Sequence, residues 1–361
     1  MKTLLVATFV DFWTGGSGHR SRISQLIGFL QDKVSITVFF AGAVSEAARE
    51  TVRQRFPQIG LEGAGDAMTY RDYSLRFSHF IRDRFYDFVL VEYIELSGIL
   101  EYLPEHTVTL LDTHDLVADR IRSFRVMGVP YDGVDLSPED ELDIFRCYDH
   151  VLFIQQNELE SVARDIHRDR LVLAPHAVAA SPSPMRESVR QIGFVASPYP
   201  PNVEALDWFL CQIWGPLRRQ HSVTLNVYGN IREAFAATAG ITAGAGGVRF
   251  HGFVEDLKQA YRECDLVINP VRCGAGLKIK NVEALAHGLP LVTTTHGASG
   301  LEDAAGSCFL PADDPPAFLS AMDRLIRDAG LRQALGRNAI EYARTHFSAE
   351  KCYGPLASII L

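Results

Sequence analysis

The sequence lacks several features that would place it in a specialised class. Its apolar stretches are all shorter than the ~18 residues that a membrane-spanning helix needs. The first apolar run stops at Asp11, and no small-residue cleavage site follows it, so a buried first strand is favoured over a signal peptide. None of its 6 cysteines forms a C-x-x-C pair. We therefore expect reduced thiols in a cytoplasmic protein, and neither a disulfide framework nor a zinc site.

Positive charge is also scarce. The formal net charge is −9, and residues 1–180 carry 18 basic against 27 acidic side chains. This balance disfavours nucleic-acid binding and broad docking to anionic membranes. One local exception is residues 70–86, where arginines alternate with aromatic residues. We expect an amphipathic helix with a solvated basic face there, and a peripheral contact at the inner membrane face is the alternative.

What the sequence does contain is a regular alternation of strand and helix patterns, and 361 residues suit two domains. Continuous apolar strands separated by helices predict parallel sheets covered on both faces. The predicted strands are Thr3–Val10, Val34–Phe40, Phe88–Glu92, Thr107–Asp112, His150–Ile154, Leu171–Leu173, Gln191–Ala196, Val223–Tyr228, Val248–Phe250, Leu266–Asn269 and Leu289–Thr294. The predicted helices include Arg22–Leu30, Asn202–Trp214, Pro315–Ala329 and Leu331–His346.

The stretch from Ala177 to Ser188 is small, rich in proline and without periodicity, which is typical of a linker. We therefore expect an α/β protein of two Rossmann-like, doubly wound domains that face a central cleft, with residues 1–180 in the first and 181–346 in the second. Ligands of such sheets bind beyond the carboxyl ends of the strands. The segments that follow each strand are therefore the candidate sites.

Glycines follow the first strand, where Gly15 and Gly16 precede a helix that carries Arg20. Bare amides at a helix start favour an anion, and the arginine adds a bidentate charge. A tight turn is the alternative. A dinucleotide fingerprint is disfavoured, because Ser21 stands where a third glycine is needed and no acid follows the second strand.

A second candidate follows another strand, at Asp112-Thr113-His114-Asp115. Polar groups gathered at a strand end are costly unless they face a cleft or each other. His114 can contact a sugar hydroxyl and carry part of the charge of a departing group, with Asp112 or Asp115 to orient it. A helix N-cap at Asp115 is the alternative.

The third candidate, Asn269 to Thr294, has the strongest signal. A glycine loop precedes Lys278 and Lys280 in the first turn of a predicted helix, where the helix dipole disfavours cations unless an anion is bound. Glu283 lies one turn further on and can accept hydrogen bonds from a ribose, or it can pair with the lysines instead. The glycine-containing loop Thr295–Glu302 follows the next strand and is either a further ligand contact or an ordinary turn.

These last two segments resemble a known family. The run Gly274-x-Gly276-x-Lys278-x-Lys280-x-x-Glu283-Ala284-Leu285-Ala286-x-Gly288-x-Pro290, with Gly297 and Gly300-Leu301 after it, resembles the retaining glycosyltransferases of the GT-B fold, the large group 1 family, which is family-four-like. His251-Gly252-Phe253-Val254-Glu255-Asp256-Leu257 and Asp112-Thr113-His114-Asp115 are similar to two more of its motifs. By the same resemblance, the last helix, 347–361, joins the N-terminal domain.

The resemblance implies a role for each candidate residue. Glu283 would bind the ribose of a nucleotide, Lys278 its diphosphate, and the segment Gly274, Ala275, Gly276 and Leu277 the transferred sugar. Gly15, Gly16 and Arg20 would approach the phosphates, and His114 and Asp115 would act near the sugar. We also expect Tyr228, Gly229, Arg272 and Lys280 to contact the donor.

Two departures from the family pattern matter. Ala275 stands where many members carry a first glutamate, eight positions before Glu283. The segment from Gly193 to Asn202 lacks the usual basic pair. We infer that Lys278, with Lys280 or Arg272, neutralises the phosphates instead.

The sequence thus predicts a glycosyltransferase that moves a hexose-type sugar from a nucleotide-sugar donor, in polysaccharide biosynthesis. The acceptor is a glycan, a lipid-linked saccharide, a protein or a small molecule. Because no Asp-x-Asp motif is present, and lysines and helix-terminal amides can neutralise the leaving group, we expect a reaction without metal or cofactor. The resemblance to the retaining family, with a cationic glycine loop and no matched carboxylate pair, implies retention at the anomeric carbon. The alternatives are a sugar-nucleotide epimerase of the same fold, or a non-catalytic nucleotide-sugar-binding or scaffold protein.

Overall fold

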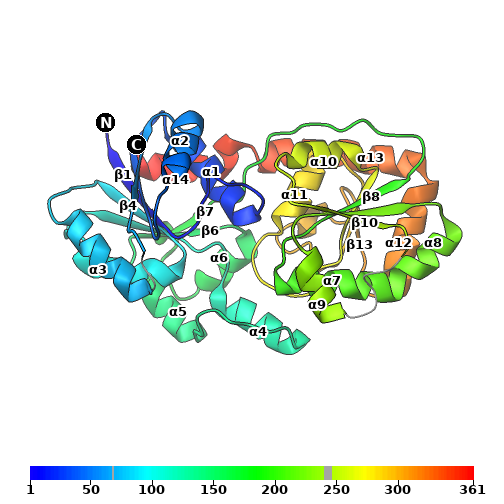
Figure 1. The fold of residues 1–361 in the computed structure, drawn as a ribbon, viewed down its shortest axis with the longest axis horizontal. Coiled ribbons are helices and arrows are strands. Elements are labelled where there is room, and N and C mark those ends of the chain that lie inside the picture. Colours follow the sequence, from blue (N-terminus) through cyan, green and yellow to red (C-terminus); the bar gives the residue numbers. More distant parts are fainter. Residues whose placement is uncertain (67–68, 240–245) are drawn as a thin grey trace. The chain divides into compact units, whose positions relative to one another are not determined.

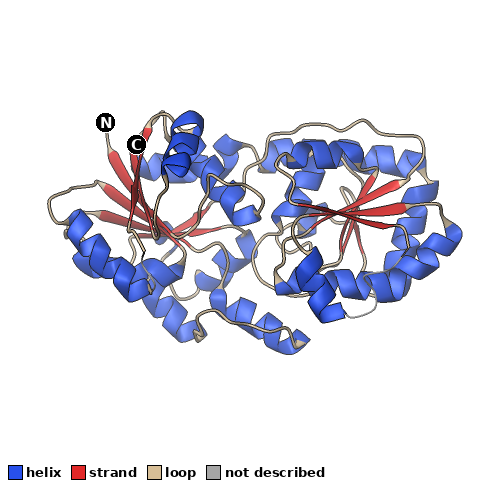
Figure 2. Ribbon diagram, viewed as in Figure 1, coloured by secondary structure: helices blue, strands red, loops and turns tan. Residues whose placement is uncertain are grey.

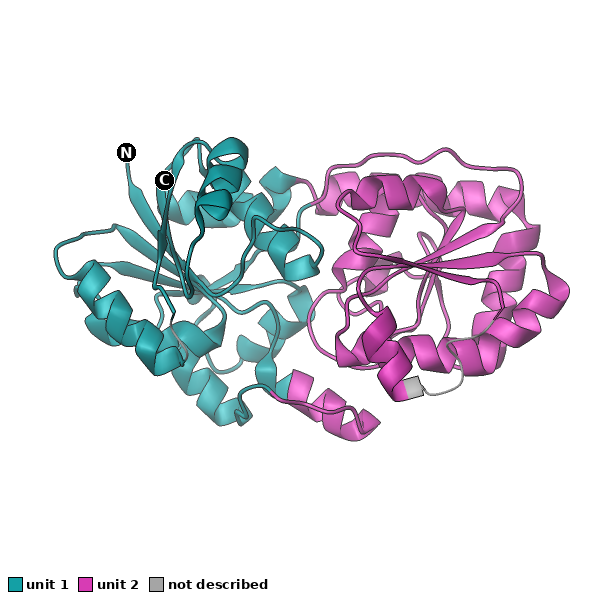
Figure 3. Cartoon of the chain, viewed as in Figure 1, with its two compact units in different colours: residues 1–119, 133–177, 349–361 teal, residues 120–132, 178–348 magenta. Residues whose placement is uncertain are grey.

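The computed structural model describes residues 1–66, 69–239 and 246–361, which form two compact units (Figure 3). Unit 1 comprises residues 1–119, 133–177 and 349–361, and unit 2 comprises residues 120–132 and 178–348. The chain passes between them at Ala177, beside the predicted boundary at residue 180. Residues 174–186 have no regular secondary structure, as expected of the predicted linker.

Unit 1 is built on a parallel sheet of seven strands in the order β3-β2-β1-β4-β5-β6-β7 (Figure 1). The strands are β1 (Thr3–Thr8), β2 (Ser35–Phe40), β3 (Ile59–Gly63), β4 (Phe88–Glu92), β5 (Val108–Asp112), β6 (His150–Phe153) and β7 (Leu171–Leu173). Helices cover both faces of the sheet (Figure 2), and Leu4, Leu5 and Val89 to Val91 are fully buried. Burial on both sides is why these strands read as continuous apolar runs.

The helices of unit 1 connect successive strands. They are α1 (Gly18–Leu30), α2 (Glu46–Arg55), α3 (Tyr70–Ile81), α5 (Pro138–Phe145), α6 (Gln156–Val162) and the 3₁₀ segments Ile94–Tyr102 and Arg168–Arg170. Helix α4 (Val117–Met127) begins in unit 1 and continues into the segment assigned to unit 2. The predicted amphipathic helix over 70–86 is thus α3, which buries Tyr73, Phe77 and Ile81 on one face.

Unit 2 has a six-stranded parallel sheet in the order β10-β9-β8-β11-β12-β13. Its strands are β8 (Gln191–Val195), β9 (Thr224–Tyr228), β10 (Val248–Gly252), β11 (Leu266–Asn269), β12 (Leu291–Thr293) and β13 (Leu310–Pro311). Its helices are α7 (Pro200–Phe209), a π-helical segment (Leu210–Trp214), α8 (Gly215–Gln220), α9 (Arg232–Ala239), α10 (Leu257–Glu263), α11 (Ile279–Ala286), the 3₁₀ segment Glu302–Ala304, α12 (Pro315–Arg327) and α13 (Ala329–His346).

The chain returns to unit 1 at its end. Helix α14 (Ala349–Ile360) belongs to that unit and packs against α1 and β7, where the rings of Tyr353 and Phe29 lie 5.7 Å apart. Tyr342 and His346 lie in α13, which stays within unit 2. The helix that joins the first unit is therefore the one after Phe347. Within the described residues, no helix is both long and apolar enough to cross a bilayer.

Both sheets reverse their strand order at one point. In unit 1, β1 lies between β2 and β4, and in unit 2, β8 lies between β9 and β11. Doubly wound sheets bind ligands outside the carboxyl ends of the strands at such a reversal. The relevant loops are therefore those that follow β1 and β4 in unit 1, and those that follow β8 and β11 in unit 2.

Candidate functional site

The glycine loop of unit 2 follows β11, at the reversal of strand order, and leads into α11. Gly274 and Gly276 have φ angles of 106° and 70°, a backbone conformation that side-chain-bearing residues rarely adopt. The amide of Gly274 donates to Ser123 Oγ over 2.9 Å. The glycines are therefore needed for the shape of the loop, and that shape keeps backbone amides close to the start of the helix.

The side chain of Lys278 is hydrogen-bonded to the backbone of this loop. Its Nζ donates to the backbone oxygens of Ala275 and Gly276, each over 2.9 Å, and the residue is half-buried. Lys278 is the N-cap residue of α11, where the helix dipole opposes a cation. The two carbonyl oxygens offset that repulsion, so the ammonium group is held at the place where the sequence predicts a diphosphate.

Lys280 lies deeper. Its Nζ donates to Asn202 Oδ1 over 2.6 Å and lies 4.8 Å from the centre of the Phe194 ring. Burial lowers the pKa of Lys280 to about 7, and the charge of Lys278 lowers it further. Asn202 lies near the start of α7, so the segment that follows β8 contributes a residue to the same cluster of polar side chains. An anion bound nearby would restore the charge of this lysine.

Glu283 is the acid of the group. Its Oε2 accepts a hydrogen bond of 2.8 Å from the hydroxyl of Tyr261 in α10. Burial raises the pKa of Glu283 to about 7, while Tyr261 and Lys280 oppose the shift. A carboxyl group tuned in this way can both accept and donate hydrogen bonds to a diol near neutral pH.

Arg272, by contrast, is already engaged. Its Nη2 donates to a carboxylate oxygen of Glu204 in α7, and its guanidinium lies 4.7 Å from the centre of the Trp208 ring. The charge of Arg272 is therefore balanced by a carboxylate, whereas the hydrogen-bond partners of Lys278 and Lys280 are backbone and amide oxygens.

His296, in the loop after β12, was not singled out as a site residue by the sequence. Burial lowers its pKa to about 4, and the nearby charge of Lys278 lowers it further. Its Nε2 atom is buried and has no hydrogen-bond partner among the described residues. A neutral imidazole beside the glycine loop is thus a further candidate for ligand contact. The signal was its position after the strand that neighbours β11.

Tyr228 is the last residue of β9, and Gly229 follows it. Gly229 has a φ angle of 115°, and a Cβ atom there would lie 2.2 Å from the backbone oxygen of Ala196. This close approach brings the ends of β8 and β9 together. The side chain of Tyr228 is buried, stacks on His251 at 4.6 Å between ring centres, and lines a cavity over the sheet.

In unit 1, His114 follows β5 and is held tightly. Its Nε2 lies 2.6 Å from Oε2 of Glu92, and its ring stacks on Tyr93 at 3.9 Å between centres. The φ angles of Tyr93 and His114 are 76° and 60°, in the left-handed region, so their backbones are strained. Strain at two adjacent strand ends is a common mark of a functional site.

The protonation of this pair follows from burial. Burial lowers the pKa of His114 to about 4 and raises the pKa of Glu92 well above its usual range. The neutral form of both groups is therefore favoured, with the carboxyl group of Glu92 donating to Nε2. The other nitrogen, Nδ1, then carries a proton that it can donate to a ligand.

We expected Asp112 or Asp115 to orient His114, and the hydrogen bond to its ring instead comes from Glu92 in the neighbouring strand. Asp112 binds Arg22 in a bidentate pair of 2.8 and 2.9 Å, and both side chains are fully buried. Asp115 is half-buried before α4, and its charge raises the pKa of His114.

The glycine loop after β1 holds Gly15 and Gly16, with φ angles of 72° and 82°. Arg20 is paired with Asp11, through Nε to Oδ1 at 2.6 Å and Nη2 to Oδ2 at 2.9 Å, and it also reaches the backbone oxygen of Gly15. The sequence gave no reason to single out Asp11. Arg20 thus braces the loop, and its charge is shared with a half-exposed acid.

Glu92, Asp112 and His114 also have ligand atoms within 4.8 Å of one another, a spacing that suits a metal ion. Arg22, however, takes both oxygens of Asp112, and Glu92 is bonded to His114. A metal ion would have to displace the buried guanidinium of Arg22, so these residues suit the Arg22–Asp112 ion pair better than they suit a metal ion. Whether the groups of the two units share one cleft stays a prediction.

Comparison with known proteins agrees with this geometry. Residues 189–328, which contain the glycine loop, Lys278 and Glu283, match the family model described as Glycosyl transferases group 1. An uncharacterized 44.6 kDa protein in the cps region of Klebsiella pneumoniae is 20% identical over 221 residues. That match covers 59% of this chain, and the chain spans 56% of the length of that curated relative.

Solved structures share the whole fold at low sequence identity. Sucrose-phosphate synthase from Thermosynechococcus elongatus has a TM-score of 0.73 and 13% identity, with 99% of this chain and 98% of that chain covered. Anabaena HepE in complex with UDP-glucose has a TM-score of 0.71 and 14% identity, with 99% of each chain covered. WaaG, a glycosyltransferase involved in lipopolysaccharide biosynthesis, has a TM-score of 0.67 and 14% identity, over 100% and 99%. Residues 189–328 therefore match the model of the group 1 glycosyltransferases, and the whole chain has the GT-B fold of these structures.

Proposed function

We propose that this protein is a group 1 glycosyltransferase that moves a hexose-type sugar from a nucleotide-sugar donor to a glycan, lipid-linked saccharide, protein or small-molecule acceptor. The proposal also includes retention of the anomeric configuration and independence of metal and cofactor. The observation that carries it is the glycine loop at the strand reversal of unit 2, with two lysine side chains and a half-buried acid around it.

The donor contacts follow from the chemistry of each group. Backbone amides at the start of α11 and the ammonium of Lys278 suit the diphosphate, and the carboxyl group of Glu283 suits the ribose diol. Structures of Anabaena HepE contain UDP and UDP-glucose, which makes uridine nucleotides the first donors to test. WaaG, which shares the fold, is involved in lipopolysaccharide biosynthesis, and this supports a role in polysaccharide biosynthesis.

The transfer step needs charge stabilisation at the leaving diphosphate. Groups already aimed at the developing charge lower the barrier most, because they need no reorganisation. Lys278 can exchange its two carbonyl partners for phosphate oxygens, and binding would restore the ammonium of Lys280. With two cations in place, a metal ion is not needed for neutralisation.

Retention requires that the acceptor attack from the face of the departing nucleotide. We propose that the leaving phosphate oxygen helps to remove the acceptor proton, since the loop offers no second carboxylate at Ala275. The neutral imidazole of His114, with its proton on Nδ1, would donate to a hydroxyl of the transferred sugar. Closure of the two domains on the linker 177–188 would then exclude water.

The first test is donor binding and turnover. Thermal unfolding of the full chain is followed with UDP, GDP, ADP and CMP, because a nucleotide present at 100 times its Kd stabilises the native state by about 2.7 kcal/mol. The sugar form of the nucleotide that binds is then used to measure transfer and hydrolysis. Turnover of the donor without any acceptor, to an isomeric nucleotide sugar, would favour an epimerase instead.

The second test uses variants. Lys278→Ala should lose about 100-fold or more in kcat, comparable with loss of one oxyanion-stabilising donor. Lys258, exposed in α10, provides the matched control Lys258→Ala. Full activity in EDTA supports the metal-independent reaction. Product of inverted configuration by NMR rules out retention, and unchanged turnover of Lys278→Ala removes the loop from the reaction.

A further inference from the structure

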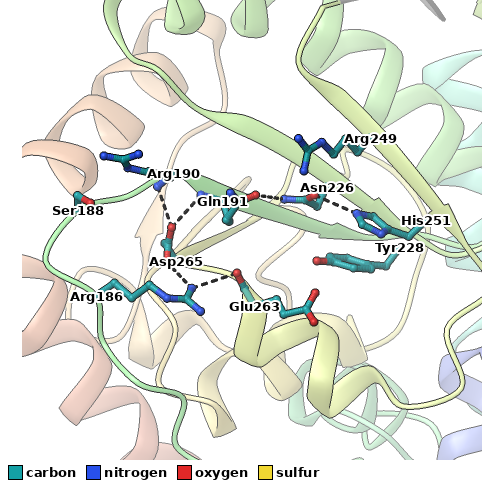
Figure 4. Close-up of a pocket in the computed structure, with 10 residues that line it drawn as sticks. All are labelled: Arg186, Ser188, Arg190, Gln191, Asn226, Tyr228, Arg249, His251, Glu263 and Asp265. Carbon is teal, nitrogen blue, oxygen red and sulfur yellow. Dashed lines mark hydrogen bonds and ion pairs between the residues drawn. The ribbon is translucent and has the colours of Figure 1, made fainter.

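The cavity of about 480 Å³ that Tyr228 lines lies in unit 2, and none of its lining residues belongs to the glycine loop (Figure 4). Small-molecule pockets typically enclose about 300–1,000 Å³. Gln191 opens β8, and Asp265 directly precedes β11, so the cavity extends to the amino-terminal ends of these strands. It is thus separate from the loops that carry the donor proposal.

One face of the sheet forms the floor of the cavity. Side chains two positions apart in a strand share a face, which places Asn226 with Tyr228 in β9. Arg249 pairs in register with Asn226, and the hydrogen bond of His251 to Asn226 brings its ring to the same face, where the register of β10 shifts. Strand β10 is the edge strand of the sheet. Figure 4 shows these side chains side by side above the strands.

A chain of hydrogen bonds fixes the polar groups of this floor. Asn226 Nδ2 donates to Gln191 Oε1 over 2.8 Å, so the oxygen of Asn226 accepts from Nε2 of His251 over 2.9 Å. The ring of His251 stacks on Tyr228 at 19°. This order leaves the amide hydrogens of Gln191 and the Nδ1 atom of His251 for a ligand, since no described residue is bonded to them.

One of the two acids that line the cavity, Asp265, is bonded within the fold, and the other, Glu263, accepts a hydrogen bond of 3.3 Å from Gln259. Asp265 accepts hydrogen bonds from Arg186 at 2.6 Å and from the backbone amides of Arg190 and Gln191 at 2.7 and 2.8 Å. Arg186 also binds the backbone oxygen of Glu263, at the end of α10. Arg186 and Asp265 therefore line the cavity as a pair whose charges balance each other.

Three arginines and two acids line the cavity, and two of the arginines have no carboxylate partner in the part of the chain that the structure describes. Within residues 1–66, 69–239 and 246–361, neither Arg190 nor Arg249 has a carboxylate partner, and both line the cavity. Isolated unpaired arginines are ordinary on protein surfaces. Here, both residues line one cavity, on opposite sides of a floor that holds preoriented amides and a stacked pair of rings (Figure 4). A guanidinium group recognises carboxylate and phosphate through bidentate hydrogen bonds.

We propose that this cavity binds a sugar that bears a carboxylate or a phosphate group. Arg249 or Arg190 binds the oxyanion, Gln191 binds sugar hydroxyls, and the stacked rings of Tyr228 and His251 contact the face of the sugar. The cavity contains Tyr228, which we expected to contact the donor, but it shares no lining residue with the glycine loop.

The experiment titrates the full chain with four probes by calorimetry: glucuronate, glucose 6-phosphate, glucose and inorganic phosphate. At least one acidic sugar should bind, at least tenfold more tightly than either glucose or phosphate. Which acidic sugar binds identifies the anion. A saturating concentration of UDP should leave this affinity unchanged, whereas competition by UDP would place the probe in the nucleotide site and overturn the proposal.

Variants complete the test. Arg190→Gln and Arg249→Gln together should weaken the binding of the acidic sugar at least tenfold. The control is Arg337→Gln, which removes an exposed arginine of α13 outside the cavity. Both proteins should keep the wild-type melting temperature and transfer rate. Equal affinity for glucose and the acidic sugars, or unchanged binding in the double variant, would refute the site.

Discussion

Replacement of Arg22 by methionine should strongly destabilise unit 1. Arg22 and Asp112 are bonded in two places and fully buried, and Asp112 pairs in register with Glu92 of the next strand. Burial raises and Arg22 lowers the pKa of Asp112, and the net shift is downward. Without Arg22, a buried carboxylate would lie beside a second carboxyl group with nothing to balance it.

The magnitude follows from the cost of breaking a buried pair, about 3–5 kcal/mol. For a unit of this size, that cost lowers the melting temperature by roughly 6–20 °C. The double variant Arg22→Met, Asp112→Leu should recover most of the loss, because no charge is left unpaired. The coupling between the two substitutions should then be at least about 2 kcal/mol.

The chain contains its own control and its own reporter. Arg20 and Asp11 form a similar bidentate pair, but their side chains are 30% and 34% exposed, so Arg20→Met should cost less than about 1 kcal/mol. Trp13 lies in unit 1 and the other two tryptophans in unit 2, so its fluorescence in a Trp208→Phe, Trp214→Phe background follows unit 1 alone during urea unfolding. If Arg22→Met shifts the transition no more than Arg20→Met, the reasoning fails.

Three further predictions concern catalysis, pH and the fold. Glu92→Gln should keep the transfer rate near that of the wild type, because the amide of glutamine can still donate to His114. Glu92→Leu should lower kcat by about 10- to 100-fold. Equal rates of the two variants would exclude a positioning role for Glu92. The pKa of Lys280 is about 7, so its positive charge is lost as the pH rises above 7. The affinity for UDP, measured by calorimetry, should therefore fall by up to about tenfold per pH unit above 7, and this pH dependence should be absent in Lys280→Arg. Gly229→Ala should yield little folded protein by circular dichroism, since φ is 115° and its Cβ would lie 2.2 Å from Ala196 O, and a wild-type melting temperature would refute this.

Much of the fold could be predicted because buried parallel strands have a strong signal. Phe88–Glu92, Leu171–Leu173 and Leu266–Asn269 have the predicted bounds, and most other predicted strands differ by one or two residues. The two strands that sequence reasoning missed, β3 and β13, lie at sheet edges. They are short and contain glycine or proline, so neither has a continuous apolar run.

The candidate residues were easier to find than their partners. His114, Lys278 and Glu283 follow strand ends or begin a helix, positions that the local pattern marks. Their surroundings depend on contacts that are distant in sequence. Arg22 meets Asp112 across 90 positions, and Lys280 meets Asn202 across 78. Such pairings depend on strand order, which one sequence does not specify.

The pairing of Glu92 with His114 shows the same limit in a single residue. The sequence placed Glu92 at the end of a strand, but nothing local indicated that β4 and β5 are neighbours. The nearer acids, Asp112 and Asp115, were therefore the natural choice for orienting the histidine. The left-handed backbone of His114 had no sequence signal either, because histidine rarely adopts it.

The central claim is that the glycine loop and the start of α11 bind the diphosphate of a nucleotide. Hydrogen exchange of the full chain, followed by mass spectrometry with and without UDP, tests it most directly. The account predicts slower exchange of the amides of residues 274–283, and loss of that protection in Lys278→Ala but not in Lys258→Ala. UDP binding that slows exchange elsewhere and leaves this segment unchanged would contradict it.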